Sequence, residues 1–242
     1  MKLRRIHLLV SLLAIAICAV AFRAQLAAPF NYIMHAMTGE KTVADRLTEF
    51  SEVVHARIQP RFREIGIAYP PKKLILVGLK QERQLELWVS DGSPDFRFLK
   101  SYPILAASGT LGPKLKEGDG QVPEGLYQIE SLNPNSRFHL ALRVNYPNAQ
   151  DEARARHDGR ADLGSDIMIH GSAVSIGCLA MGDQAAEDLF VLAAETGIKN
   201  ISVLLAPIDF RVRDLPPDSL PPSSWTPELY ADIRKALSSL KR

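Results

Sequence analysis

Hydrophobic positions recur with two different periods along this chain of 242 residues. Between residues 40 and 66, apolar residues recur at three- and four-residue steps with charges between them. This spacing predicts an amphipathic helix, which Pro60 should break or kink. After residue 72, most apolar runs are short or alternate with polar residues, which is typical of strands. Strands are predicted within 73–90 (two strands joined by a turn at 80–83), 96–108, 126–132, 137–144, 166–170 and 200–207.

The remaining segments are predicted as helices or loops. A helix is expected after Asp183, which suits an N-cap, and before Gly197, which suits a C-cap. The segment 109–125 is too glycine-rich for regular structure, and 145–165 is polar and loop-like. A proline-rich stretch from residue 208 leads into a weakly helical 227–240. The pattern as a whole predicts a mainly β protein with helices, of the α+β class.

Strand 137–144 is predicted to present two distinct faces, because side chains alternate along a strand. One face carries Phe138, Leu140, Leu142 and Val144, and the other carries Arg137, His139 and Arg143.

Composition excludes few classes of protein. Hydrophobic residues make up 46% and charged residues 23% of the chain, as in an ordinary globular protein. The net charge of +2, without a basic stripe, gives no electrostatic reason to expect a nucleic-acid partner.

The N-terminus resembles an export signal. Basic residues in 1–7 precede an uncharged apolar run at 8–22, which is short for a membrane span of about 20 residues. Cleavage would follow the small residues Ala19 to Ala21, whereas failure to cleave would anchor the protein in the inner membrane and leave the rest in the periplasm. Both outcomes stay open. Cys18 could suggest lipid modification, but Ile17 is bulky for that motif.

Beyond this segment the chain has one cysteine, Cys178, so the exported part can form no internal disulfide. A buried structural thiol is one interpretation. His170 lies eight residues earlier at the end of a predicted strand, and Gly171 and Gly177 allow the chain to turn back. A thiol needs a base beside it to act as a nucleophile. His35 and His55 are instead interpreted as structural.

The segments "LGPKLKEGDGQVPEGLYQI", "NPNSRFHL", "YPNAQD" and "IHGSAVSIGCLAM" occur in this order. Together they resemble the L,D-transpeptidase catalytic domain (YkuD) family over about residues 72–206, and within it the YafK-type branch. The resemblance implies a β-sandwich catalytic domain. It also implies domains at 1–22 (signal or anchor), 23–71 (helical lead-in), 72–207 (catalytic) and 208–242 (tail).

The resemblance further implies roles for the residues of the motif. Cys178 would be the nucleophile and His170 the general base, with the imidazole oriented by the carbonyl of Gly171. Backbone N–H groups around Gly177 and Cys178 would form the oxyanion hole. The substrate would be the meso-diaminopimelate of a peptidoglycan stem peptide, attacked to form a thioester. No cofactor or metal is implied.

Two positions depart from the usual family signature. Ile176 stands where a second histidine is usual, and Ala180 where an arginine is usual. Because the stem peptide presents carboxylates, other groups near the site are candidates for binding it. These substrate-binding candidates are Ser175, Lys114, Lys116, Arg137, His139 and Arg143, and the alternative for any single cation is an ordinary solvated charge.

Three functions stay open at this point. The YafK-type branch favours an amidase that hydrolyses the link between peptidoglycan and a covalently attached outer-membrane lipoprotein. The first alternative is a true transpeptidase that forms cross-links or attaches protein. The second is a non-catalytic cell-wall-binding module.

Overall fold

The computed structural model describes residues 39–216 and 223–241. The predicted export segment 1–22 and His35 lie outside this range. From Thr42 onward the described chain forms one compact unit. The predicted helical lead-in and tail therefore contribute helices to the same unit as the predicted catalytic region. No helix in these ranges is both long enough and apolar enough to cross a membrane.

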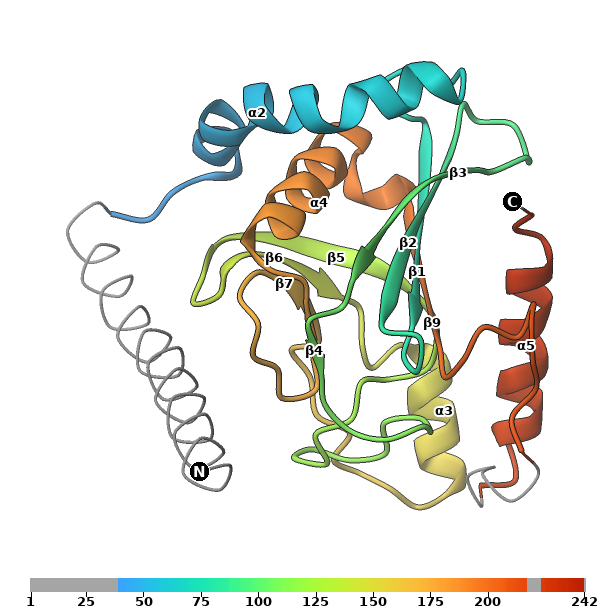
Figure 1. Ribbon diagram of the computed structural model, residues 1–242. Coiled ribbons are helices and arrows are strands. Elements are labelled where there is room, and N and C mark those ends of the chain that lie inside the picture. Colours follow the sequence, from blue (N-terminus) through green and yellow to red (C-terminus); the bar gives the residue numbers. More distant parts are fainter. Residues whose placement is uncertain (1–38, 217–222, 242) are drawn as a thin grey trace, which may run out of the picture. The chain divides into compact units, whose positions relative to one another are not determined.

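Within the described ranges, nine strands form one continuous sheet that curls on itself (Figure 1). The strand order is β3-β2-β1-β9-β5-β6-β7-β8-β4. Pairing is antiparallel except between β1 and β9 and between β7 and β8. The strands are β1 (Lys73–Leu79), β2 (Gln84–Ser90), β3 (Arg97–Pro103), β4 (Ala106–Ala107), β5 (Gly125–Ser136), β6 (His139–Val144), β7 (Met168–His170), β8 (Leu179–Ala180) and β9 (Ile201–Ala206).

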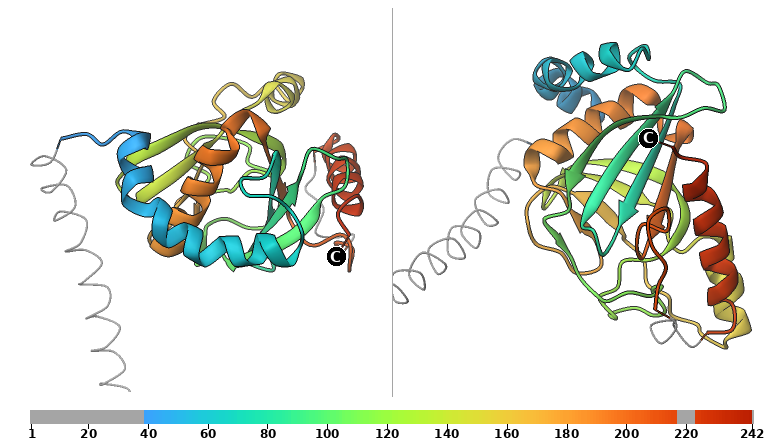
Figure 2. Two further views of the ribbon diagram at one scale, coloured as in Figure 1. Left: turned by 90° about the horizontal axis from the view of Figure 1, so that it is seen from above. Right: turned by 45° about the vertical axis from the view of Figure 1, so that its right-hand side comes forward.

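Helices cover the sheet, which confirms the α+β class. In Figures 1 and 2, α4 (Asp183–Thr196) lies between the sheet and α2 (Val43–Glu64). Both figures place α5 (Thr226–Ser238) on another side of the sheet from α4. Helix α3 (Ala149–His157) lies in the connection between β6 and β7. A short 3₁₀ helix, η1 (Ile198–Asn200), joins α4 to β9.

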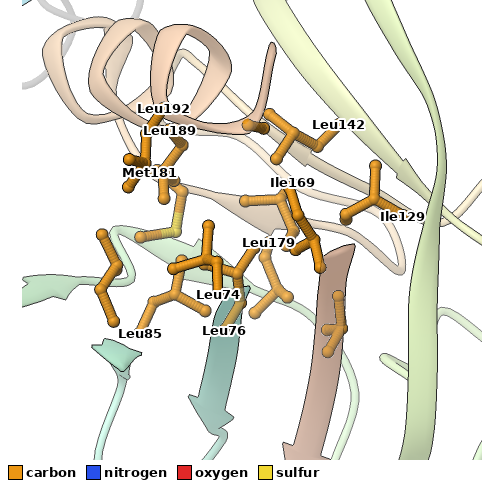
Figure 3. Packing of buried hydrophobic residues seen from close by; sticks show 14 of the residues in the cluster. Leu74, Leu76, Leu85, Ile129, Leu142, Ile169, Leu179, Met181, Leu189 and Leu192 are labelled. Atoms are coloured by element: carbon orange, nitrogen blue, oxygen red, sulfur yellow. The ribbon is translucent and has the colours of Figure 1, made fainter. Parts of the chain in front are cut away.

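Two apolar clusters lie on the two faces of strand β1. Leu74 and Leu76 face the larger cluster, which includes Leu189 of α4 (Figure 3). Val77 faces the smaller cluster, which includes Ile233 of α5. Burial on both faces gives β1 its nearly continuous apolar sequence. Since each face is covered by a different helix, α4 and α5 together position the sheet.

Several sequence-based predictions need correction. Helix α2 continues through Pro60 to Glu64, because Phe62 beyond the proline is buried in the core. The polar segment 145–165 contains helix α3, which begins with a capping box formed by Asn148 and Asp151. The N-cap of α4 is Gly182 rather than Asp183, whereas the C-cap is Gly197 as predicted.

The predicted strand 137–144 begins two residues later, at His139. His139 has a φ of +74°, so the turn between β5 and β6 breaks the alternation just before the strand. Leu140, Leu142 and Val144 are buried together as predicted, whereas Phe138 is 41% exposed. Phe138 therefore lies outside the core, where its side chain is free to contact other groups.

Candidate active site

His170 ends strand β7, and its ring is held by two neighbours. Its Nδ1 lies 2.6 Å from the carbonyl oxygen of Gly171. A carbonyl can only accept a hydrogen bond, so Nδ1 carries the proton and the Nε2 lone pair is free. The ring of Phe138 stacks on the imidazole with centroids 4.7 Å apart. Burial lowers the pKa of His170, and the bond to Gly171 offsets part of that effect.

Cys178 immediately precedes strand β8, which runs parallel to β7. The register pairs Ile169 with Leu179, so Cys178 lies beside Met168. The Met168 N–H donates to the Cys178 sulfur at 3.4 Å, and the thiol donates to the Asp166 carbonyl at 3.5 Å. Burial has the largest effect and raises the pKa of the thiol; the hydrogen bond from Met168 lowers it, and the Asp166 carboxylate raises it by a smaller amount. The thiol is therefore protonated near neutral pH.

The parallel register brings the two candidate catalytic residues together from positions eight apart in sequence. In this register Cys178 lies opposite Met168, and Met168 lies on the same face of β7 as His170, two residues later. Cys178 therefore lies diagonally from His170 on that face. Both residues lie in the part of the chain that the structure describes, and no hydrogen bond joins the imidazole to the thiol there. The thiol donates to the Asp166 carbonyl instead. A neutral thiol beside a neutral imidazole suits proton transfer during attack rather than a preformed ion pair.

The residues before Cys178 form a tight turn, and Gly177 lies within it with a φ of +86°. The Gly177 N–H donates to Ser108 Oγ at 2.5 Å, and the Cys178 N–H donates to Ser175 Oγ at 3.0 Å. Ser175 Oγ also donates to the Cys178 carbonyl at 2.5 Å. The two N–H groups expected in an oxyanion hole are thus engaged by serine hydroxyls. Ser175 therefore helps to position Cys178 by bonding to both of its backbone groups.

Arg143, one of the predicted substrate-binding cations, lies in β6 opposite Met168, whose N–H donates to the Cys178 sulfur. Its guanidinium forms ion pairs with Glu130 at 2.9 Å and with Asp166 at 3.0 Å. Asp166 is also the residue whose carbonyl accepts from Cys178. The Arg143 side chain is 35% exposed, so a ligand carboxylate can reach it in exchange for one of its partners.

The other predicted substrate-binding cations differ in their surroundings. Lys114 is buried, and its ammonium binds the Asp119 carboxylate at 2.7 Å. Its charge therefore helps to stabilise the glycine-rich segment to which both residues belong. Lys116 and Arg137 are exposed. His139 turns toward the helices, where its ring lies 3.2 Å from Glu187 of α4. The Lys114 ammonium also acts on the Cys178 thiol, whose pKa it lowers slightly. The role of all these cations as substrate ligands stays a prediction.

Ala180, where an arginine is usual, is fully buried in β8 opposite Ala106. The structure therefore leaves no room at this position for a cation. Ile176, at the other departure, is 89% exposed.

Three contacts of the site were not foreseen from sequence. Ser108 was assigned to the end of the predicted strand 96–108, yet it bonds to Gly177 across the site. Phe138 was assigned to a strand face but stacks on His170. Asp183 was expected to cap its own helix, but its carboxylate accepts the Ser172 N–H at 2.7 Å. A serine or aspartate beside glycines is too common a pattern to indicate such long-range contacts.

Among the described residues, no cluster of three or more His, Cys, Asp or Glu side chains could hold a metal ion. The candidate site is built instead from a thiol, an imidazole and backbone groups. His55, interpreted from sequence as structural, contacts Glu195 of α4 at 3.0 Å and lies in α2. This contact helps to join the two helices.

Comparison with known proteins places this geometry in context. The family model described as the L,D-transpeptidase catalytic domain (YkuD) matches residues 72–201. The curated proteins named "Putative L,D-transpeptidase YafK" from Escherichia coli strains K12 and O157:H7 are each 39% identical to the chain over 140 residues. The match covers 56% of this chain and 53% of either relative. The chain thus spans about half the length of the curated relatives it matches.

Solved structures show weaker similarity. The helical cell shape determining protein Pgp2 from Campylobacter jejuni is 23% identical, with a TM-score of 0.44 and coverage of 55% of this chain and 47% of that one. Bdellovibrio bacteriovorus Bd1075 is 22% identical, with a TM-score of 0.42 and coverage of 56% and 48%. The family model, which matches more than half of the sequence, carries the assignment: the chain belongs to the L,D-transpeptidase catalytic domain family.

Proposed function

We propose that the protein is a cysteine enzyme of the cell envelope that acts on the meso-diaminopimelate of peptidoglycan stem peptides. The observation that carries this proposal is the pairing of β7 with β8, which places Cys178 and His170 on one face. Family membership and the free Nε2 of His170 support it. The similarity to the YafK proteins supports peptidoglycan as the substrate class.

The chemistry follows from the protonation states of the pair. The Cys178 sulfur attacks the amide carbonyl of the substrate while its proton moves to His170 Nε2. The resulting imidazolium is stabilised by the Gly171 carbonyl at Nδ1. It then donates the Nε2 proton to the leaving amine as the C–N bond breaks, which leaves a thioester on Cys178. General acid–base catalysis of this kind contributes about 10²–10⁴-fold to the rate.

We propose that water resolves the thioester, so that the enzyme hydrolyses the link between a stem peptide and an attached lipoprotein. His170 takes a proton from water as the oxygen attacks the thioester carbonyl, and it returns that proton to the sulfur as the C–S bond breaks, which restores the thiol. The resemblance of the sequence to the YafK-type branch supports this choice. Arg143 is proposed to bind a substrate carboxylate, because it lies beside Asp166 and is partly exposed.

The export of the protein to the periplasm is part of this proposal. It is supported by the sequence pattern of residues 1–22 and by the location of peptidoglycan outside the inner membrane. Whether that segment is cleaved decides between a free and an anchored enzyme.

The test is mass analysis of muropeptides after incubating the full chain with tripeptide- and tetrapeptide-rich peptidoglycan, with and without attached lipoprotein. Release of lipoprotein without new cross-links is expected. New diaminopimelate–diaminopimelate cross-links or amine exchange would instead identify a transpeptidase.

Variants of the pair test the nucleophile and the base separately. Cys178→Ala is expected to abolish turnover, and His170→Ala to lower it by at least about 10²-fold, with the fold retained. Lys199→Ala, an exposed residue before β9, is the control. A thiol-reactive carbapenem should label Cys178 in the wild type. Absence of labelling and of turnover would favour the cell-wall-binding module.

A further inference from the structure

We infer that Asp183 is a positioning residue for His170 and acts on it through the peptide group between Gly171 and Ser172. The inference rests on the proposed function, in which His170 is the general base. The Gly171 carbonyl accepts from His170 Nδ1 at 2.6 Å, and the Ser172 N–H donates to Asp183 Oδ1 at 2.7 Å. Both backbone groups belong to a single peptide unit.

The geometry of a peptide unit explains how one contact affects the other. The unit is planar, and in its trans form the C=O and N–H point in opposite directions. The Asp183 carboxylate therefore lies at one end of a hydrogen-bond chain that ends at His170 Nδ1. Bonds in such a chain polarise one another, and each strengthens the next by about 10–30%. A carboxylate on the N–H makes the carbonyl oxygen a stronger acceptor for the imidazole proton.

The consequence for His170 is a fixed tautomer. A stronger acceptor at Nδ1 holds the proton there and leaves Nε2 free to take the thiol proton. The same contact stabilises the imidazolium formed during attack, as a side-chain carboxylate does in a serine protease triad. Asp183 would thus supply an acidic member for the pair, since among the described residues the imidazole bonds to a backbone carbonyl and to no carboxylate.

The backbone around this contact is built for a close approach. A Cβ atom on Gly171 would lie 2.6 Å from Asp183 Oδ1 and 2.7 Å from the Phe138 carbonyl oxygen. Ser172 has a φ of +62°, a conformation that is unfavourable for a residue with a side chain. The Ser172 carbonyl is held by the Gly182 N–H at 2.8 Å, while its N–H binds Asp183. Strain held from both sides is typical of a functional site.

A simpler role for Asp183 is to interact with the dipole of α4, since it lies in the first turn of that helix. That role needs a negative charge at the helix start but no contact with Ser172. The N-cap residue of α4, Gly182, has no side chain that could cap the helix. Because the carboxylate is directed at the loop, the two roles can be separated by moving the charge.

The experiment compares wild type with Asp183→Ala and Asp183→Asn by ¹⁵N NMR of the His170 ring. The wild type should show the Nδ1–H tautomer. Asp183→Ala, which loses both charge and acceptor, should shift the ring toward a mixture of tautomers. Asp183→Asn keeps an acceptor oxygen, so its tautomer population should lie between those of the wild type and Asp183→Ala. If the alanine variant does not fold, the asparagine variant alone tests the inference. An unchanged Nδ1–H tautomer in the variant that folds overturns the inference.

A double variant, Asp183→Ala with Gln184→Asp, serves as the matched control. It returns a charge to the first turn of α4 without returning the bond to Ser172. If Asp183 acts through the peptide, the tautomer stays mixed in this protein. Recovery of the Nδ1–H tautomer would show that only the helix dipole matters and would overturn the inference.

The rate of Cys178 acylation by a carbapenem gives a second readout. Loss of an outer contact of this kind is expected to lower it about 10-fold in Asp183→Ala. An unchanged rate would overturn the inference. If the proposed function is wrong, wild-type Cys178 is not acylated, yet the tautomer measurement still decides the role of Asp183. The two failures are therefore distinguishable.

Discussion

Two loops meet at the candidate site, and the groups that hold them are buried to different degrees. The glycine-rich loop (residues 108–124) is fixed by buried charges. For example, the Lys80 ammonium donates to the Glu124 carboxylate at 2.8 Å. The cysteine loop (residues 171–178) is fixed by serine hydroxyls and by one exposed carboxylate, that of Asp183, and its Val174 and Ile176 point into solvent. Loss of one partner from a buried charge pair is strongly destabilising, whereas neutral or exposed hydrogen bonds each contribute less. The glycine-rich loop thus serves as the rigid support for a more lightly held cysteine loop.

The largest effect is expected from breaking the buried charge pair. Glu124 accepts from Lys80, from the Gly112 N–H and from the Tyr230 hydroxyl of α5, each at 2.8 Å. Glu124→Leu should cost about 3–5 kcal/mol of unfolding free energy, because it leaves the Lys80 ammonium buried without its charge partner. Urea denaturation measures the loss.

The control for this prediction is Glu117→Gln, an exposed glutamate in the same loop that should change stability little. Combining Glu124→Leu with Lys80→Met should recover much of the loss, since both charges are then removed. A double variant as unstable as the single one would mean that packing, not charge, holds this end of the loop.

A smaller loss is expected at the tip of the same loop. The Asp119 carboxylate accepts from the Lys114 ammonium and from the N–H groups of Leu115, Lys116 and Gln121. Asp119→Ala should lower the unfolding free energy by about 1–3 kcal/mol, because these donors lose their acceptor. Thermal or urea denaturation at neutral pH measures it.

The same carboxylate gives a pH dependence whose sign is fixed. Burial alone would raise the pKa of Asp119, but its hydrogen bonds hold the pKa below the ordinary value. Its contribution is present above the unfolded-state pKa, which is about 3.9, and is lost as pH falls through the lower folded-state pKa. Asp119→Ala should therefore flatten the acid side of the stability profile. A profile parallel to wild type below pH 4 would contradict this.

The contact between the two loops should have a smaller effect. Ser108 Oγ accepts the Gly177 N–H and donates to the Gly120 carbonyl at 2.7 Å. Ser108→Ala should cost about 1 kcal/mol and speed hydrogen exchange at the Gly177 amide, because that N–H loses its acceptor. Ser202→Ala, an exposed serine on β9, is the control. Unchanged exchange at Gly177 would show that the cysteine loop does not depend on its neighbour.

The smallest effect is expected from removing the Asp166 charge near the thiol. The Asp166 carboxylate contributes to raising the pKa of Cys178, after burial. Asp166→Asn should lower the thiol pKa by less than about one unit, so more thiolate is present at a given pH. The pH profile of iodoacetamide alkylation measures it, with Asp162→Asn as the control. A raised thiol pKa would contradict the predicted direction.

The sequence predicts the strands of this fold better than its polar helix. The hairpin of β1 and β2 was identified because apolar strands flank a polar turn. Helix α3 was missed because Ala155 is its one buried residue, so it lacks the apolar stripe on which periodicity depends. Pro60 failed to end α2 because tertiary packing of Phe62 outweighs the local preference.

The candidate site was predictable as residues but not as contacts. Cys178 and His170 stand in a motif, and the glycines between them indicate a turn. The parallel register that makes them neighbours depends on the packing of β7 and β8 against the whole sheet. The Ser108 and Asp183 contacts join segments distant in sequence, and no local pattern specifies them.

The place of β9 in the sheet sets the smallest fragment that can be handled as an independent protein. The matched family region ends at residue 201, whereas β9 runs from Ile201 to Ala206 between β1 and β5. A fragment cut at that end would open the sheet through its middle and leave the edges of β1 and β5 exposed, which favours aggregation. It would also lose Tyr230, which binds Glu124. The unit for expression or transplantation therefore extends through α5.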